Sequence, residues 1–68
     1  MIRSGHTARA RRQLNITIAE DAQAILVIKE GDRLVATGEV DANGHQPFIH
    51  LNSSMENIWL SRHDVEPA

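Results

Sequence analysis

The side chains of this chain best suited to bind an anion are its arginines. A guanidinium group presents several N–H donors at once and can bind phosphate oxygens through them. The candidate nucleic-acid-binding set joins the arginines at the start of the chain to one near its end: Arg3, Arg9, Arg11, Arg12 and Arg62. In this hypothesis residues 1–12 form a flexible basic arm that reaches a phosphate backbone.

The distribution of charge limits that hypothesis. Residues 1–12 hold four arginines and no acid, whereas residues 13–68 hold nine acidic residues against three basic ones, so their net charges are +4 and −6. Any phosphate contact would belong to the arm, because the rest of the chain repels polyanions. A second interpretation is that the arm lies against acidic residues of its own chain or of a neighbour.

Two histidines and an aspartate could be drawn as a metal site. His45, His50 and Asp41 lie close together in the sequence, and imidazole with carboxylate is a common set of zinc ligands. A turn and a strand, and not one helix, separate these residues, however, and their spacing matches no diagnostic pattern of metal ligands. Asp41-Ala42-Asn43-Gly44 instead predicts a tight hairpin turn. We therefore predict no metal and no cofactor.

The stretch Ser61-Arg62-His63-Asp64 contains the residue types of a nucleophilic triad. Sequence neighbours diverge, however, because successive side chains point to opposite faces of a strand or about 100° apart around a helix. The glycines are scattered along the chain and form no phosphate-binding loop. The sequence thus predicts that the protein is not an enzyme.

The length of the chain, 68 residues, predicts one small domain. A domain of this size buries only about 60% of its unfolded surface, so its core is marginal. Disulfides cannot compensate because the chain has no cysteine, and association into a homo-oligomer is the expected alternative. No apolar run approaches the ~20 residues of a membrane span and no secretion signal is recognisable, so we expect a cytoplasmic protein.

Alternating apolar residues predict a single β domain over residues 13–66. Strands are expected at residues 14–18, 24–28, 33–40 and 48–51. The expected fold is mainly β, a small antiparallel meander of four or five strands arranged as a half-open barrel or a sheet. Its expected core consists of the inward-facing apolar residues Leu14, Ile16, Ile18, Ile25, Val27, Leu34, Ala36, Val40, Ile49, Leu51, Ile58 and Leu60.

The C-terminal residues 53–64 allow two interpretations. Ser53 and Glu56 match a capping box, which predicts a short C-terminal helix. The alternation of Ile58 and Leu60 with an outward Trp59 instead predicts a fifth strand over residues 57–61. Leu60 falls off the apolar stripe of the helix, which favours the strand and leaves the helix as the alternative.

Residues 24–28 are apolar on both faces of the expected strand. Such a run is typical of a strand that is covered on both sides. A lone sheet of this size covers only one side, so the second face is expected to contact another subunit. That face is Leu26 and Ile28, or else Ile25 and Val27. Trp59 could anchor the same partner, or it could close the core of its own chain.

The C-terminal part of the chain resembles two small RNA-binding families. Residues 48–51 and 58–65 are similar to the last strands of Sm-like barrels, in which Arg62-His63 would stand for a basic–histidine pair. The same stretch is similar to the final strand of the carbon-storage-regulator family, with Arg62 as the basic residue. Both families form oligomers. The similarity leaves the rest of the chain uncovered, so we assign the chain to neither.

These observations predict a small, non-enzymatic, self-associating β-module that binds another macromolecule, expected to be a protein. The alternative is a small nucleic-acid-binding regulator that uses the N-terminal arginines. We expect a homo-oligomer and no membrane partner. The expected interface residues are Leu26, Ile28 and Trp59.

Overall fold

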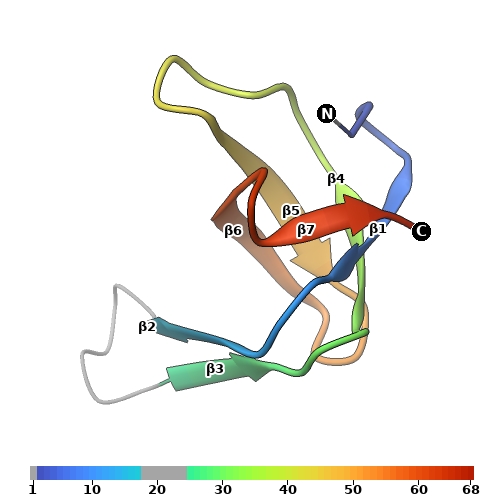
Figure 1. Cartoon of the computed structure of the whole chain (residues 1–68), viewed down its shortest axis with the longest axis vertical. Coiled ribbons are helices and arrows are strands. Elements are labelled where there is room, and N and C mark those ends of the chain that lie inside the picture. The colour runs from blue at the N-terminus through green and yellow to red at the C-terminus, as the bar shows by residue number, and fades with distance from the viewer. Residues whose placement is uncertain (1, 18–24) are drawn as a thin grey trace.

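The computed structural model describes residues 2–17 and 25–68. These residues contain strands and no helix, which confirms the mainly β, antiparallel class and rules out the C-terminal helix. No helix in the described ranges is long and apolar enough to cross a membrane. The strands are β1 (Thr7–Ala10), β2 (Leu14–Thr17), β3 (Ile25–Ile28), β4 (Arg33–Ala36), β5 (His45–His50), β6 (Met55–Ser61) and β7 (Val65–Pro67) (Figure 1).

The strands are divided between a five-stranded sheet, in the order β6-β5-β4-β1-β7, and a two-stranded sheet of β2 and β3. β4, β5 and β6 follow one another as an antiparallel meander. β1 lies between β4 and β7, so segments from both ends of the chain meet in one sheet. The two-stranded sheet, called here the β2–β3 ribbon, extends away from the larger sheet (Figure 1).

The turn that leads into β5 forms where the sequence predicts one. Asp41 Oδ1 accepts the backbone N–H groups of Asn43 and His45, at 2.9 and 3.0 Å. Gly44 has a φ of 81°, a left-handed conformation that glycine adopts without steric cost. These short-range contacts depend only on neighbouring residues, which is why the tetrapeptide alone is enough to predict the turn.

The N-terminal segment differs most from its prediction. Residues 1–12 are expected to form a flexible arm, but Thr7–Ala10 form β1, which is paired along both edges. Ala8 and Ala10 are buried, at 0% and 2% exposed, while Arg9 points outward. The physical reason is that Ala8 and Ala10 give this strand an apolar face that packs in the core, while its backbone pairs with β4 and β7. The β-domain therefore begins before residue 13.

Residues ahead of β1 are also attached to the sheet. Ile2 is 6% exposed and belongs to the hydrophobic core. Its carbonyl oxygen accepts a hydrogen bond from the buried Gln46 side chain, whose amide also donates to the carbonyl of Gly38 at 2.9 Å. Gly38 lies against Pro47, and a Cβ at Gly38 would come within 3.0 Å of Pro47 Cγ. This close contact lies beyond the end of β4, which stops at Ala36.

β6 resolves the ambiguity at the C-terminal end in favour of the strand. It runs from Met55 to Ser61, with Ile58 and Leu60 buried and Trp59 exposed, as the strand interpretation predicts. Its register with β5 passes from Phe48↔Ile58 to His50↔Met55, so β6 has one extra residue there. Asn57, with a φ of 57°, lies in this bulge.

The core is shared between the sheet and the ribbon. Phe48, Ile28 and Leu34 are the largest side chains that are fully buried. The expected core is correct for Leu14, Leu34, Ala36, Ile58 and Leu60, and Ile16 packs against them. It is wrong for Ile25, Val27 and Leu51, which are exposed, whereas Val40 and Ile49 are half-buried and Ile18 lies outside the described residues.

Candidate interaction surface

The two faces of the β2–β3 ribbon have different environments. Register pairs Leu14 with Ile28 and Ile16 with Leu26, and these four residues pack into or against the core. The opposite face holds Ile25 and Val27, which are 60% and 45% exposed. β3 is therefore apolar on both faces but covered on one, and its outer face is the Ile25–Val27 alternative of the sequence-based prediction.

The expected interface residues are placed differently from one another. Ile28 is fully buried inside its own chain, so it is not available to a partner. Leu26 is half-buried against the core, and Trp59 is 51% exposed on β6. Ile28 therefore lies on the face of β3 that packs in the core, and the exposed face is the Ile25–Val27 alternative, because the sequence does not say which side of an all-apolar strand faces the core.

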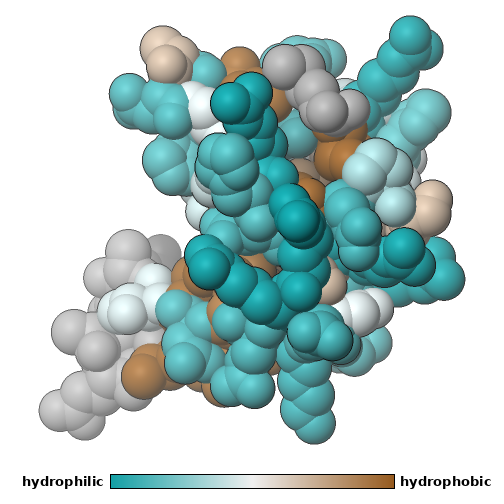
Figure 2. Space-filling view, viewed as in Figure 1, coloured by the Kyte–Doolittle hydropathy of each residue, from teal (hydrophilic) through white to brown (hydrophobic). Residues whose placement is uncertain are grey.

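A groove of about 300 Å³ lies between the ribbon and β6. Most of its walls are apolar side chains, with Ile16 and Leu26 on the ribbon and Met55, Ile58 and Trp59 on β6. Both strands of the ribbon therefore line the groove, together with the polar residues Thr17, Glu56 and Asn57. Figure 2 shows hydrophobic surface at the ribbon end of the molecule and mostly hydrophilic surface over the centre of the view.

Two of the arginines proposed for nucleic acid are paired with acids of the same chain. Arg9 Nε lies 3.1 Å from Glu66 Oε1, and an Arg12 guanidinium nitrogen lies 2.7 Å from Asp64 Oδ1. Both acids belong to the C-terminal segment, which agrees with the interpretation that the N-terminal charge lies against acids of its own chain. Within the described ranges Arg3, Arg11 and Arg62 have no ion pair.

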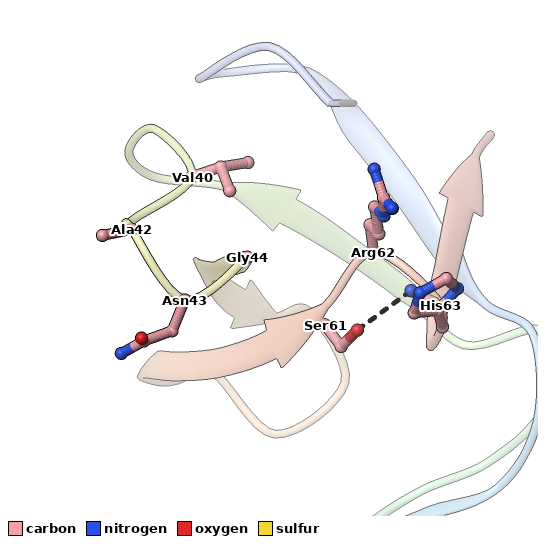
Figure 3. A pocket seen from close by; sticks show the side chains of 7 residues that line it. All are labelled: Val40, Ala42, Asn43, Gly44, Ser61, Arg62 and His63. Atoms are coloured by element: carbon pink, nitrogen blue, oxygen red, sulfur yellow. Dashed lines mark hydrogen bonds between the residues drawn. The ribbon is translucent and has the colours of Figure 1, made fainter.

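Arg62 borders a pocket of about 430 Å³ between the turn ahead of β5 and the turn between β6 and β7. The pocket residues are Val40, Ala42, Asn43, Gly44, Ser61, Arg62 and His63. Figure 3 shows that the Asn43 side chain points away from Arg62 and His63. Ser61 Oγ accepts the His63 backbone N–H at 3.2 Å, and Ser61 N–H donates to Asp64 at 3.3 Å. The polar groups here serve the turn and do not converge on one point.

The structure brings together a different serine, histidine and aspartate. His50 Nε2 lies 2.8 Å from Asp32 Oδ2, and His50 Nδ1 lies 2.7 Å from Ser53 Oγ. The hydrogen bond from His50 is the main cause that lowers the pKa of Asp32, and the N–H of Lys29 adds to it. His50 is 3% exposed, whereas Asp32 is half-buried and Ser53 is exposed, so the buried ring joins two turns that lie at the surface.

The hydrogen bonds of this cluster, called here the His50 cluster, hold the turn before β4 against the turn after β5. Ser53 Oγ is also the acceptor of the Met55 N–H, at 3.3 Å, and holds the start of β6. The described pockets do not include His50, Asp32 or Ser53 among their lining residues. Sequence reasoning missed the cluster because Asp32 and His50 are 18 positions apart and only the pairing of β4 with β5 brings them together.

His45, His50 and Asp41 do not form the metal site drawn from the sequence, and the carboxylate beside His50 is that of Asp32. Among residues 2–17 and 25–68, no group of three or more His, Cys, Asp or Glu side chains could hold a metal ion. Asp41 instead accepts backbone N–H groups of its own turn, and the hydrogen bond from the N–H of His45 is the main cause that lowers its pKa.

Comparison with other proteins adds no functional information. No protein-family model matches the chain, and neither a curated protein nor a solved structure is significantly similar to it.

Proposed function

We propose that the chain is a non-enzymatic β-module that associates with a second copy of itself through β3 of the β2–β3 ribbon, where apolar side chains are exposed. The observation that carries the proposal is the exposure of Ile25 and Val27, at 60% and 45%, on a strand whose opposite face is in the core. Burying apolar surface gains about 25 cal/mol per Å². Contact with a second chain would bury apolar surface that the described residues leave exposed.

The absence of charge on this face favours a second copy over a charged partner. The described residues of its outer surface are Asn15 and Thr17 on β2, paired with Val27 and Ile25 on β3. A twofold interface is formed by the same surface of both copies, so a surface with charge of one sign would repel itself. A face of two amide or hydroxyl side chains and two aliphatic side chains carries no such penalty.

The internal ion pairs support this proposal over the nucleic-acid alternative. Arg9 and Arg12 already contact Glu66 and Asp64, so a phosphate would have to displace these carboxylates. Titration of labelled single-stranded RNA with the protein at low salt tests the alternative directly. Salt-sensitive binding that requires Arg9 and Arg12 would favour the regulator.

The experiment for self-association is sedimentation velocity over a wide range of protein concentration, with thermal melting on the same samples. We expect the mass to rise from monomer to dimer and the melting temperature to rise with it, because association stabilises only the folded chain. The double variant Ile25→Thr/Val27→Thr should remain monomeric. Leu51→Thr is the matched control, since Leu51 is 47% exposed but lies off the ribbon. A wild-type chain that stays monomeric at every concentration overturns the proposal.

A further inference from the structure

The β2–β3 ribbon ends in an open strand edge. In the part of the chain that the structure describes, β3 pairs with β2 along one edge and with no strand along the other. We infer that this edge pairs antiparallel with β3 of a second copy, so that two ribbons join into one continuous sheet across a twofold axis. The inference rests on the proposed self-association and adds the strand, the register and the symmetry.

The open edges of the larger sheet are protected, whereas that of β3 is not. β6 carries a bulge at Asn57, and β7 is short and carries Glu66 and Pro67. Bulges, charges and prolines are the devices by which proteins prevent edge pairing. Ile25–Ile28 contains none of them and is rich in β-branched residues that favour strands.

The open edge of β2 differs from that of β3 in position. The groove shared with β6 is lined by Ile16 and Thr17 of β2 and by Leu26 of β3, so both strands of the ribbon face it. In the view of Figure 1, β2 lies on the side of the ribbon nearer to β6, and the open edge of β3 is on the farther side. A two-stranded ribbon is marginally stable in water by itself, and pairing through β3 would double its number of strands.

The alternation of side chains sets the register. Directly opposed residues of an antiparallel pair share one face of the sheet. Placing Leu26 on the twofold axis opposes Ile25 to Val27 of the second copy, so that the exposed apolar residues of both chains form one row. Moving the axis to Val27 would oppose Ile25 to the exposed Lys29 and break that row. We therefore place the axis at Leu26.

Edge pairing also accounts for how two side chains could support a stable dimer. A standard interface buries about 800 Å² on each partner, which two aliphatic side chains cannot supply alone. Strand addition contributes main-chain hydrogen bonds together with side-chain contacts. The row formed by Ile25 and Val27 from both chains would then provide the apolar part of the interface.

Disulfide cross-linking tests the register because the chain has no cysteine of its own. The variants Ile25→Cys and Val27→Cys are prepared separately, one with an affinity tag, then mixed and oxidised. Directly opposed residues have Cβ atoms about 4.5–5.5 Å apart, close to disulfide geometry. Same-numbered residues are diagonal neighbours about 7–8 Å apart, which is beyond easy reach. We expect mixed dimers to form several-fold faster than either self-linked dimer.

Each other outcome overturns a defined part of the argument. Equal rates of cross-linking for the mixed dimer and the self-linked dimers overturn the register. The register is also overturned if Ile25→Cys cross-links to Val27→Cys no faster than to the off-ribbon control Leu51→Cys. A chain that dimerises in the sedimentation experiment but yields no cross-link through β3 overturns edge pairing while leaving self-association intact. A chain that never dimerises overturns both. Ile25 and Val27 are exposed, so circular dichroism should show that the cysteine variants keep the wild-type fold.

Discussion

β3 and β5 show that burial in this protein follows from the position of a strand more than from its hydrophobicity. β3, with the sequence Ile-Leu-Val-Ile, is wholly apolar, yet Ile25 and Val27 are exposed. β5 contains His45, Gln46 and Pro47 ahead of Phe48, yet four of its six residues are buried. The difference lies in what surrounds each strand: β5 is an inner strand paired with β4 and β6, whereas among the described residues β3 pairs only with β2 and packs on the core through one face.

β5 and β3 also differ in their polar groups: β5 buries polar side chains, whereas β3 has only main-chain polar groups. β5 can bury Gln46 because its amide donates to the carbonyls of Ile2 and Gly38, and it can bury His50 because Asp32 and Ser53 contact its ring. Burying a polar side chain without such partners would cost about 1–3 kcal/mol. β3 has no polar side chain to satisfy, but it has main-chain groups at an open edge. Among the described residues, each sheet has two edge strands, and β3 is the edge strand that consists of apolar residues alone.

Removing a large side chain from each strand should give the largest difference between them. Phe48→Ala empties a fully buried site and should lower the free energy of unfolding by about 3–5 kcal/mol. Val27→Ala removes a side chain that is 45% exposed and should change the stability of the monomer by well under 1 kcal/mol. Urea denaturation at a concentration where the chain is monomeric measures both values. Similar losses for the two variants would contradict the comparison.

A smaller loss of stability is expected when the His50 cluster, which joins the turn before β4 to the turn after β5, is disrupted. Asp32→Asn removes the carboxylate that accepts hydrogen bonds from His50 and from the N–H of Lys29, and should cost about 1–3 kcal/mol near neutral pH. The pKa of Asp32 is lowered from its ordinary 3.8 in the folded chain. Its contribution is therefore present above pH 3.8 and is lost as the pH falls through the lower folded value.

The measurement is the stability difference between the wild type and Asp32→Asn from neutral to acidic pH. The difference should shrink below pH 3.8 as the wild-type carboxylate is protonated. Asp41→Asn is the matched control, because Asp41 also has a lowered pKa but accepts hydrogen bonds only from backbone N–H groups in an exposed turn. A difference that stays constant down to the lowest pH would show that the carboxylate charge of Asp32 plays no part.

The parts of the fold that the sequence predicts are those fixed by near neighbours. The turn at Asp41–Gly44 depends on four consecutive residues, and the alternation of Ile58 and Leu60 identifies β6. β1 was missed because its apolar face consists of Ala8 and Ala10, which carry little hydrophobic signal beside three arginines.

The exposure of Ile25 and Val27 depends on which face of β3 packs on the core, which the tertiary fold decides and the residues of β3 do not. The same reason explains why the exposed face of β3 could not be chosen from the sequence. The two faces of an all-apolar strand are equivalent in sequence. Ile28 was expected at the interface and lies in the core because Leu14, its partner on β2, faces the core too.

The smallest expected effect is that of a surface ion pair on stability. The outer side of β1 and β7 carries charged side chains, whereas the described outer face of the ribbon carries none. Arg9 and Glu66 face each other at 3.1 Å with side chains that are 51% and 45% exposed. A double-mutant cycle with Arg9→Met and Glu66→Gln should give a coupling of about 0–1 kcal/mol. The coupling should vanish near 1 M salt, where the screening length is only about 3 Å.

The same salt series should leave self-association unweakened, because the outer face of the ribbon consists of Asn15, Thr17, Ile25 and Val27, which carry no charge. Arg11→Met is the control for the cycle, since Arg11 is exposed and has no ion pair among the residues described. Sedimentation at low and high salt makes the comparison. A dimer that dissociates as salt is added would mean that charged groups hold the two copies together, and the interface would then have to be sought at the arginines and acids of β1 and β7 instead of at β3.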